Sequence, residues 1–168
     1  SDKTGTLTCN EMTVQRVVTA NQVYEVSGSG YRPEGGLHRS GHSATHNVAL
    51  DDHPALPGIA RAALLCNDAA LHESDGSWVL TGDPTEGALV ILAADEGVDV
   101  EACRRDRTRR DEVPFDSATK VMVTVHDRTD GAPGRIAYVK GAPDVLLPRT
   151  TAWLDPDRRR EVEAALDD

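Results

Sequence analysis

The residues with the most evident chemistry stand at the start of the sequence, which reads Ser1-Asp2-Lys3-Thr4-Gly5-Thr6-Leu7-Thr8. A carboxylate such as that of Asp2 can attack a phosphoryl group and form an aspartyl-phosphate. Lys3 would offset charge on the transferring group, and the hydroxyl of Thr4 could contact phosphate and Mg²⁺. Gly5 lets the backbone turn closely past such a site. A frayed polar terminus is the alternative explanation of the same residues.

Residues 2–8 spell the phosphorylation signature of the P-type ATPases, and five further segments resemble the calcium- and sodium-pump classes of that family. They are Tyr31-Arg32-Pro33-Glu34-Gly35-Gly36, Cys66-Asn67-Asp68, residues 82–89 (GDPTEGAL), Pro114-Phe115-Asp116-Ser117 with Lys120 and Met122, and Lys140-Gly141-Ala142-Pro143-Asp144. Their order and rough spacing agree with the family. The resemblance implies that residues 1–8 are a stub of the phosphorylation domain and residues 9–168 a C-terminally truncated nucleotide-binding domain.

The resemblance also implies ATP and Mg²⁺ as ligands. Asp2 would be the phosphoryl acceptor, with Lys3 and Thr4 in the catalytic group, and Asp2 and Thr4 would contact the metal. The residues that it implies for nucleotide binding are Glu86, Phe115, Lys120, Met122, Lys140, Gly141 and Ala142. Among these, the family's matching Phe stacks on adenine and its matching Glu accepts a hydrogen bond from the adenine amino group.

The basic residues give some independent support to this site. Of the 18 basic residues only Lys3, Lys120 and Lys140 are lysines, and all three lie in segments that match the family. A lysine is a compact charge that suits phosphate. Lysines exposed at strand ends would be the alternative explanation. Glu86 could also cap the backbone of a helix, because it stands three residues after the expected helix N-cap Asp83. This capping role is compatible with a hydrogen bond to the adenine amino group.

The mechanism that the resemblance implies is ATP hydrolysis through an aspartyl-phosphate, coupled to cation transport across a membrane. In related haloacid-dehalogenase-like phosphatases a second Asp acts as acid-base two residues after the nucleophile, and here that position is Thr4. A soluble phosphatase is therefore the weaker alternative. The segment GDGxND, which supplies Mg²⁺ ligands in the family, does not occur, so we expect these residues to bind nucleotide without turnover.

The partners implied are the phosphorylation, actuator and membrane domains of the same pump, together with the transported cation. The parent would lie in the cell membrane with this domain on the cytoplasmic side. A net charge of −10 argues against a nucleic-acid partner. A heavy-metal-transporting P-type ATPase is a further alternative because of the dipeptide His53-Pro54, but the glycine-rich partner motif of that class is missing.

Composition fits one globular domain. The chain has 168 residues, 39% hydrophobic and 27% charged. Its longest apolar run, residues 88–94, is far shorter than the roughly 20 residues that span a bilayer. Three widely spaced cysteines suggest neither disulfides nor a zinc site. The solvated end of a helix is the favoured interpretation of a group of arginines: Arg104, Arg105, Arg107, Arg109 and Arg110.

The elements that must position these residues indicate an α+β fold with an antiparallel β-sheet. The resemblance implies that this is a twisted antiparallel β-sheet flanked by helices. Expected strands cover residues 12–18, 23–26, 78–80, 112–115, 121–126 and 135–140, and expected helices cover 57–67, 84–97, 99–109, 142–147 and a segment after Asp155-Pro156. Residues 27–57 are expected to form a loop without an element. Within it His38, His42 and His46 recur every four residues, and a solvated loop is favoured over a metal site.

Overall fold

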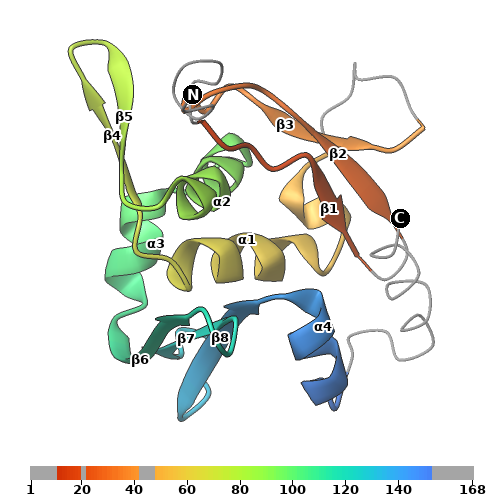
Figure 1. Ribbon diagram of the computed structural model, residues 1–168, viewed down its shortest axis with the longest axis vertical. Coiled ribbons are helices and arrows are strands. Elements are labelled where there is room, and N and C mark those ends of the chain that lie inside the picture. Colours follow the sequence, from red (N-terminus) through yellow and green to blue (C-terminus); the bar gives the residue numbers. More distant parts are fainter. Residues whose placement is uncertain (1–10, 20–21, 42–47, 153–168) are drawn as a thin grey trace.

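The computed structural model describes residues 11–19, 22–41 and 48–152. In chain order, the elements of these ranges are β1 (Arg16–Val18), β2 (Val23–Ser27), β3 (Gly36–Arg39), the 3-10 turn η1 (Leu50–Asp52), α1 (Leu56–Leu65), β4 (Ala70–Ser74), β5 (Ser77–Thr81), α2 (Pro84–Asp95), α3 (Val100–Asp106), β6 (Arg109–Asp116), β7 (Val121–Asp127), β8 (Arg135–Gly141), α4 (Pro143–Leu146) and the 3-10 turn η2 (Leu147–Arg149). Helix α1 crosses the middle of the molecule, with α2 and the sheet β1–β3 above it and the sheet β6–β8 below (Figure 1).

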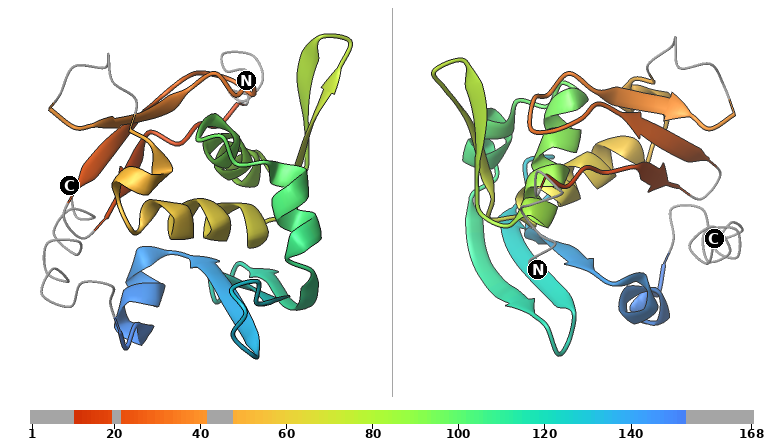
Figure 2. Two further views of the ribbon diagram at one scale, coloured as in Figure 1. Left: turned by 180° about the vertical axis from the view of Figure 1, so that it is seen from behind. Right: turned by 45° about the horizontal axis from the view of Figure 1, so that its top comes forward.

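The expected α+β class is confirmed, with one difference in the arrangement of the strands. The described ranges contain three antiparallel sheets, in the orders β1-β2-β3, β4-β5 and β6-β7-β8, where one sheet was expected. The hairpin β4–β5 projects from the rest in both views of Figure 2. Strand β4 was not predicted, because its sequence Ala-Leu-His-Glu-Ser has little β-branched or aromatic character.

The prediction that residues 27–57 lack an element is wrong. Strand β3 pairs with β2, and η1 and the first turn of α1 also fall in this range. The other edge of β3 is held by the end of α2, where Asp95 Oδ1 accepts from the Gly35 N–H and Glu96 Oε1 accepts from the Leu37 N–H, each at 3.0 Å. These two carboxylates lie about 60 residues away in sequence, so no local pattern could show that the strand forms.

Helix α2 forms where the sequence predicted it. The Asp83 carboxylate caps its first turn by accepting from the N–H groups of Thr85 and Glu86, and Pro84 takes the first helical position. Gly87 leaves room for Leu80, because a Cβ at position 87 would stand 2.3 Å from a methyl carbon of Leu80 and displace that side chain. Helices α1 and α2 share a core cluster of apolar side chains: Leu64, Leu65, Ala69, Val90, Ala93 and Cys103.

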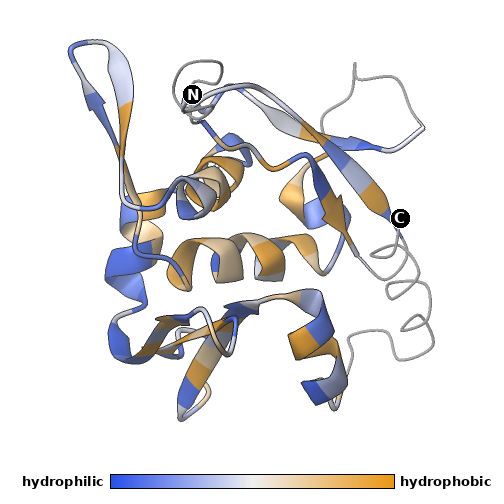
Figure 3. Cartoon of the chain, in the orientation of Figure 1, coloured by the Kyte–Doolittle hydropathy of each residue, from blue (hydrophilic) through white to orange (hydrophobic). Residues whose placement is uncertain are grey.

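The sheet β6–β8 has two distinct faces, which follow from the alternation of residues along β7. Met122, Thr124 and His126 are buried on the face toward α1, whereas the valines between them are partly exposed on the other face. Strand β8 does not alternate in hydropathy in this way, since its mostly hydrophobic middle lies between the hydrophilic residues Arg135 and Lys140 (Figure 3). The face toward α1 therefore carries the side chains that reach the interior.

The arginine group does not form a solvated helix end, so that prediction is wrong for two of its members. Arg104 is half-buried and donates to the backbone carbonyls of Leu64 and Ala69. Arg109 donates to the carbonyls of Leu65 and Asn67. These bonds tie α3 and β6 to the end of α1, whose last carbonyls lack helical partners.

None of the helices in the described ranges combines the length and the apolar character that a bilayer span needs. The helix expected after Asp155-Pro156 lies outside the described residues.

Candidate functional site

A cavity of about 650 Å³ opens between the first turn of α2 and the sheet β6–β8. All seven residues that were predicted to bind nucleotide line it: Glu86, Phe115, Lys120, Met122, Lys140, Gly141 and Ala142. They come from α2, from all three strands of the sheet and from the segments that follow β6 and β8. The structure thus brings together residues that lie up to 56 positions apart in the sequence.

Phe115 reaches the cavity because β6 contains a bulge. Val113 pairs with Val123 and Asp116 pairs with Val121, so two residues of β6, Pro114 and Phe115, lie opposite Met122 alone. Without the extra residue Phe115 would share the outer face with Val113; with it, Phe115 lines the cavity together with Met122. Phe115 is 58% exposed, an unusual degree for the only phenylalanine of the chain. It is therefore accessible to a planar ligand.

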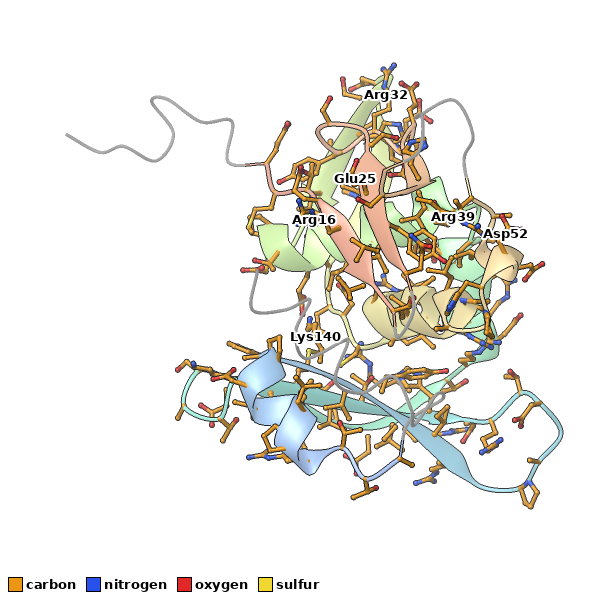
Figure 4. All side chains as sticks on the ribbon, turned by 90° about the vertical axis from the view of Figure 1, so that its right-hand side faces the viewer. Arg16, Glu25, Arg32, Arg39, Asp52 and Lys140 are labelled. Atoms are coloured by element: carbon orange, nitrogen blue, oxygen red, sulfur yellow. The ribbon has the colours of Figure 1, made fainter. Side chains whose placement is uncertain are left out.

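Glu86 and Lys140 form an ion pair inside the cavity. Lys140 Nζ lies 2.5 Å from Glu86 Oε1, and the exposed fractions of the two side chains are 25% and 15%. The second carboxylate oxygen, Oε2, accepts from the backbone N–H of Asp68 at 3.1 Å. Lys140 lies between the sheet and the elements above it (Figure 4). The alternative explanation, a lysine exposed at a strand end, does not fit Lys140, since most of its side chain is buried.

Lys120 differs from Lys140 in exposure and in backbone conformation. Its side chain is 57% exposed, and Nζ lies 4.0 Å from Asp144. Its φ of 55° is in the left-handed region, which residues other than glycine rarely adopt. The Lys120 carbonyl oxygen approaches Gly141 so closely that a Cβ there would lie 2.5 Å from it. The backbone turn before β7 therefore requires glycine at position 141, whether or not a ligand is bound.

Within the Cys66-Asn67-Asp68 segment, Asn67 has a structural role. Asn67 Nδ2 donates to the carbonyl oxygens of Ala63 (3.0 Å) and Glu86 (2.8 Å), and Oδ1 accepts from the Ala69 N–H at 2.8 Å. The end of α1 and the start of α2 are thereby held together, and this positions Glu86.

Two titratable groups near the cavity are perturbed. Hydrogen bonding by the Thr85 side chain is the largest of the causes that lower the pKa of the Asp83 carboxyl, so the cap of α2 stays charged at neutral pH. Burial raises the pKa of the Cys66 thiol, which therefore stays protonated at neutral pH and is a poor nucleophile.

Sequence reasoning missed four further residues that line the cavity: Asp68, Asp83, Thr85 and Leu89. A signal was present for all of them, since each lies in a segment that resembles the P-type ATPases. What the sequence could not show is the hydrogen bond from the Asp68 backbone N–H to Glu86 or the contact of the Asp68 carboxylate with Arg109 at 2.6 Å.

The predicted catalytic and metal-binding residues Asp2, Lys3 and Thr4 lie outside the described residues, as do His42 and His46. His38 is buried on β3, with Nε2 2.8 Å from Ser27 Oγ, so it does not belong to a solvated loop as expected. Within the described ranges no three His, Cys, Asp or Glu side chains come together in a way that could hold a metal ion.

Comparison with known sequences identifies the class of protein to which this fold and this cavity belong. A protein-family model described as P-type ATPase, cytoplasmic domain N, matches residues 55–167. The chain belongs to this family, the cation-transporting P-type ATPases, and the matched residues are those of their cytoplasmic domain N.

Individual relatives agree with the family match. The chain is 40% identical to a cation-transporting ATPase of Synechocystis and 36% identical to a calcium-transporting ATPase of Bacillus subtilis, with 100% and 99% of this chain aligned. It is 38% identical over 91% of its length to the human calcium-transporting ATPase type 2C member 1. The aligned region is 19%, 19% and 16% of these relatives, so the chain spans less than a fifth of their length.

Proposed function

We propose that this chain binds ATP in the cavity between α2 and the sheet β6–β8, as the nucleotide-binding part of a cation-transporting ATPase. One observation carries the proposal: the exposed ring of Phe115 and the charged groups Glu86, Lys120 and Lys140 line a single cavity. An aromatic face suits adenine, a carboxylate accepts from its amino group, and ammonium groups attract phosphate.

The volume of the cavity and its lining fit a ligand of this kind. Small-molecule sites usually measure about 300–1,000 Å³ and combine apolar walls with a few polar groups. Here Leu89 and Phe115 supply apolar surface, and the Glu86–Lys140 pair supplies the polar edge. Because Lys140 is already paired, a nucleotide has to share or replace that contact, which favours weak binding.

The test is an ATP titration of the 168-residue chain followed through its amide signals. We expect a Kd of about 0.1–10 mM, equivalent to roughly 3–5 kcal/mol. The Phe115→Ala variant should bind about 5-fold to 100-fold more weakly, as expected for the loss of one stacked base. Val113→Ala is the matched control, because Val113 stands on the same strand, is 59% exposed and belongs to the opposite face. Equal effects of the two substitutions would contradict the site.

For the whole protein we propose ATP hydrolysis through a phosphorylated Asp2 and transport of a cation across a membrane. The proposal rests on residues 2–8 and on the family to which the chain belongs. Asp2 and Thr4 would hold Mg²⁺, which would stabilise negative charge on the transferring phosphoryl group together with Lys3. The partners would be the remaining domains of the pump.

A further inference from the structure

A second cavity, of about 260 Å³, lies beside the end of α1 and is rich in positive charge. Its lining includes Arg104, Arg107 and Arg109 but only one carboxylate, that of Asp68. This excess of positive charge contrasts with the net charge of −10 of the chain. The local field therefore favours an anion.

The three guanidinium groups differ in how many of their N–H donors are already hydrogen-bonded within the chain. Arg104 donates to backbone carbonyls, and Arg109 donates to carbonyls and to the carboxylates of Asp68 and Glu112. For Arg107, the described part of the chain provides only a long contact from Nη1 to the sulfur of Cys103, at 3.7 Å. Most donors of the Arg107 guanidinium are thus available to a ligand.

A buried acceptor without a partner accompanies these donors. His126 lines the same cavity and is 2% exposed. Its Nδ1 lies 2.9 Å from the Arg107 carbonyl oxygen, which can only accept, so Nδ1 carries a hydrogen. Nε2 is then an acceptor in the neutral ring, and it has no hydrogen-bond partner among the described residues. Such a buried orphan is uncommon in proteins and calls for a donor.

We infer that this cavity is a binding site for hydrogen phosphate. The ion has oxygens that accept from Arg107 and a negative charge that the neighbouring guanidinium groups stabilise. It also has one hydroxyl, which can donate to His126 Nε2. The site is separate from the proposed nucleotide cavity, although Asp68 lines both.

The site is tested by titrating the full 168-residue chain with inorganic phosphate at constant ionic strength and without nucleotide. Amide signals of Arg107 and Arg109 should shift and saturate. Arg107→Gln should weaken the affinity about tenfold, because a charged hydrogen bond is lost. Arg105→Gln is the matched control: Arg105 stands two residues earlier, its side chain is 72% exposed, and it does not line the cavity.

Three results would overturn the inference: shifts that do not saturate, equal weakening in the two arginine variants, or sulfate binding as tightly as phosphate. Sulfate carries no hydroxyl at neutral pH, so it should bind several-fold more weakly. Phe115→Ala should leave the phosphate affinity unchanged, and Arg107→Gln should leave the ATP affinity unchanged. The phosphate site and the nucleotide site can therefore be refuted independently of each other.

Discussion

Replacing Lys140 by methionine should weaken both folding and nucleotide binding. The substitution keeps the apolar stem but leaves the Glu86 carboxylate, which is 15% exposed, without its cation. Breaking a fully buried pair costs about 3–5 kcal/mol, whereas an exposed pair contributes about 0–1 kcal/mol. With side chains 25% and 15% exposed, the Glu86–Lys140 pair lies between these limits, so we expect a loss of about 2 kcal/mol. For a chain of this size the melting temperature should fall by roughly 4–8 °C.

The assay is thermal unfolding by circular dichroism, together with ATP titration by calorimetry. Lys120→Met is the matched control, because Lys120 lines the same cavity but is 57% exposed and its nearest carboxylate is 4.0 Å away. It should weaken ATP binding and leave the melting temperature nearly unchanged. Equal melting temperatures for the two variants would refute the importance of the Glu86–Lys140 pair to the fold.

Three further predictions concern other parts of the chain. Gly141→Ala should destabilise the chain by about 1–3 kcal/mol in urea unfolding, because the new Cβ meets the Lys120 carbonyl oxygen; unchanged stability would contradict the close approach. Burial raises the pKa of the Asp95 carboxyl, and the hydrogen bond from the Gly35 N–H opposes this increase. The folded chain therefore loses stability as the pH rises above 3.8, which is the ordinary pKa of this carboxyl. The stability of Asp95→Asn relative to wild type should therefore increase between about pH 4 and pH 7, and a constant difference would refute this. Asp2→Asn should leave the ATP affinity of this chain unchanged in calorimetry, and a weaker affinity would place Asp2 at the site.

The elements that sequence reasoning predicted correctly are those with local signals. Helix α2 carries its own N-cap, Asp83, and a proline at its first position. Strand β7 alternates over its whole length, so its two faces could be assigned. Strand β3 has four residues, and distant carboxylates hold it in place, so it had no comparable signal.

For the site, the sequence indicated which residues belong together but not how they are oriented. The segments that resemble the P-type ATPases gave all seven cofactor-binding predictions, and the structure gathers these around one cavity. The bulge that directs Phe115 inward and the pairing of Lys140 with Glu86 depend on strand register. The bonds from Arg109 to the end of α1 likewise depend on tertiary packing, so the arginines looked like ordinary surface charge.

The central claim, that ATP lies with adenine on Phe115, is tested most directly by intermolecular nuclear Overhauser effects in a solution of the chain with saturating ATP. We predict contacts from the adenine H2 and H8 protons to the ring protons of Phe115 and to the methyl group of Met122, which line the cavity together. Adenine contacts confined to Val113 and Val139, on the opposite face of the sheet, would contradict the account.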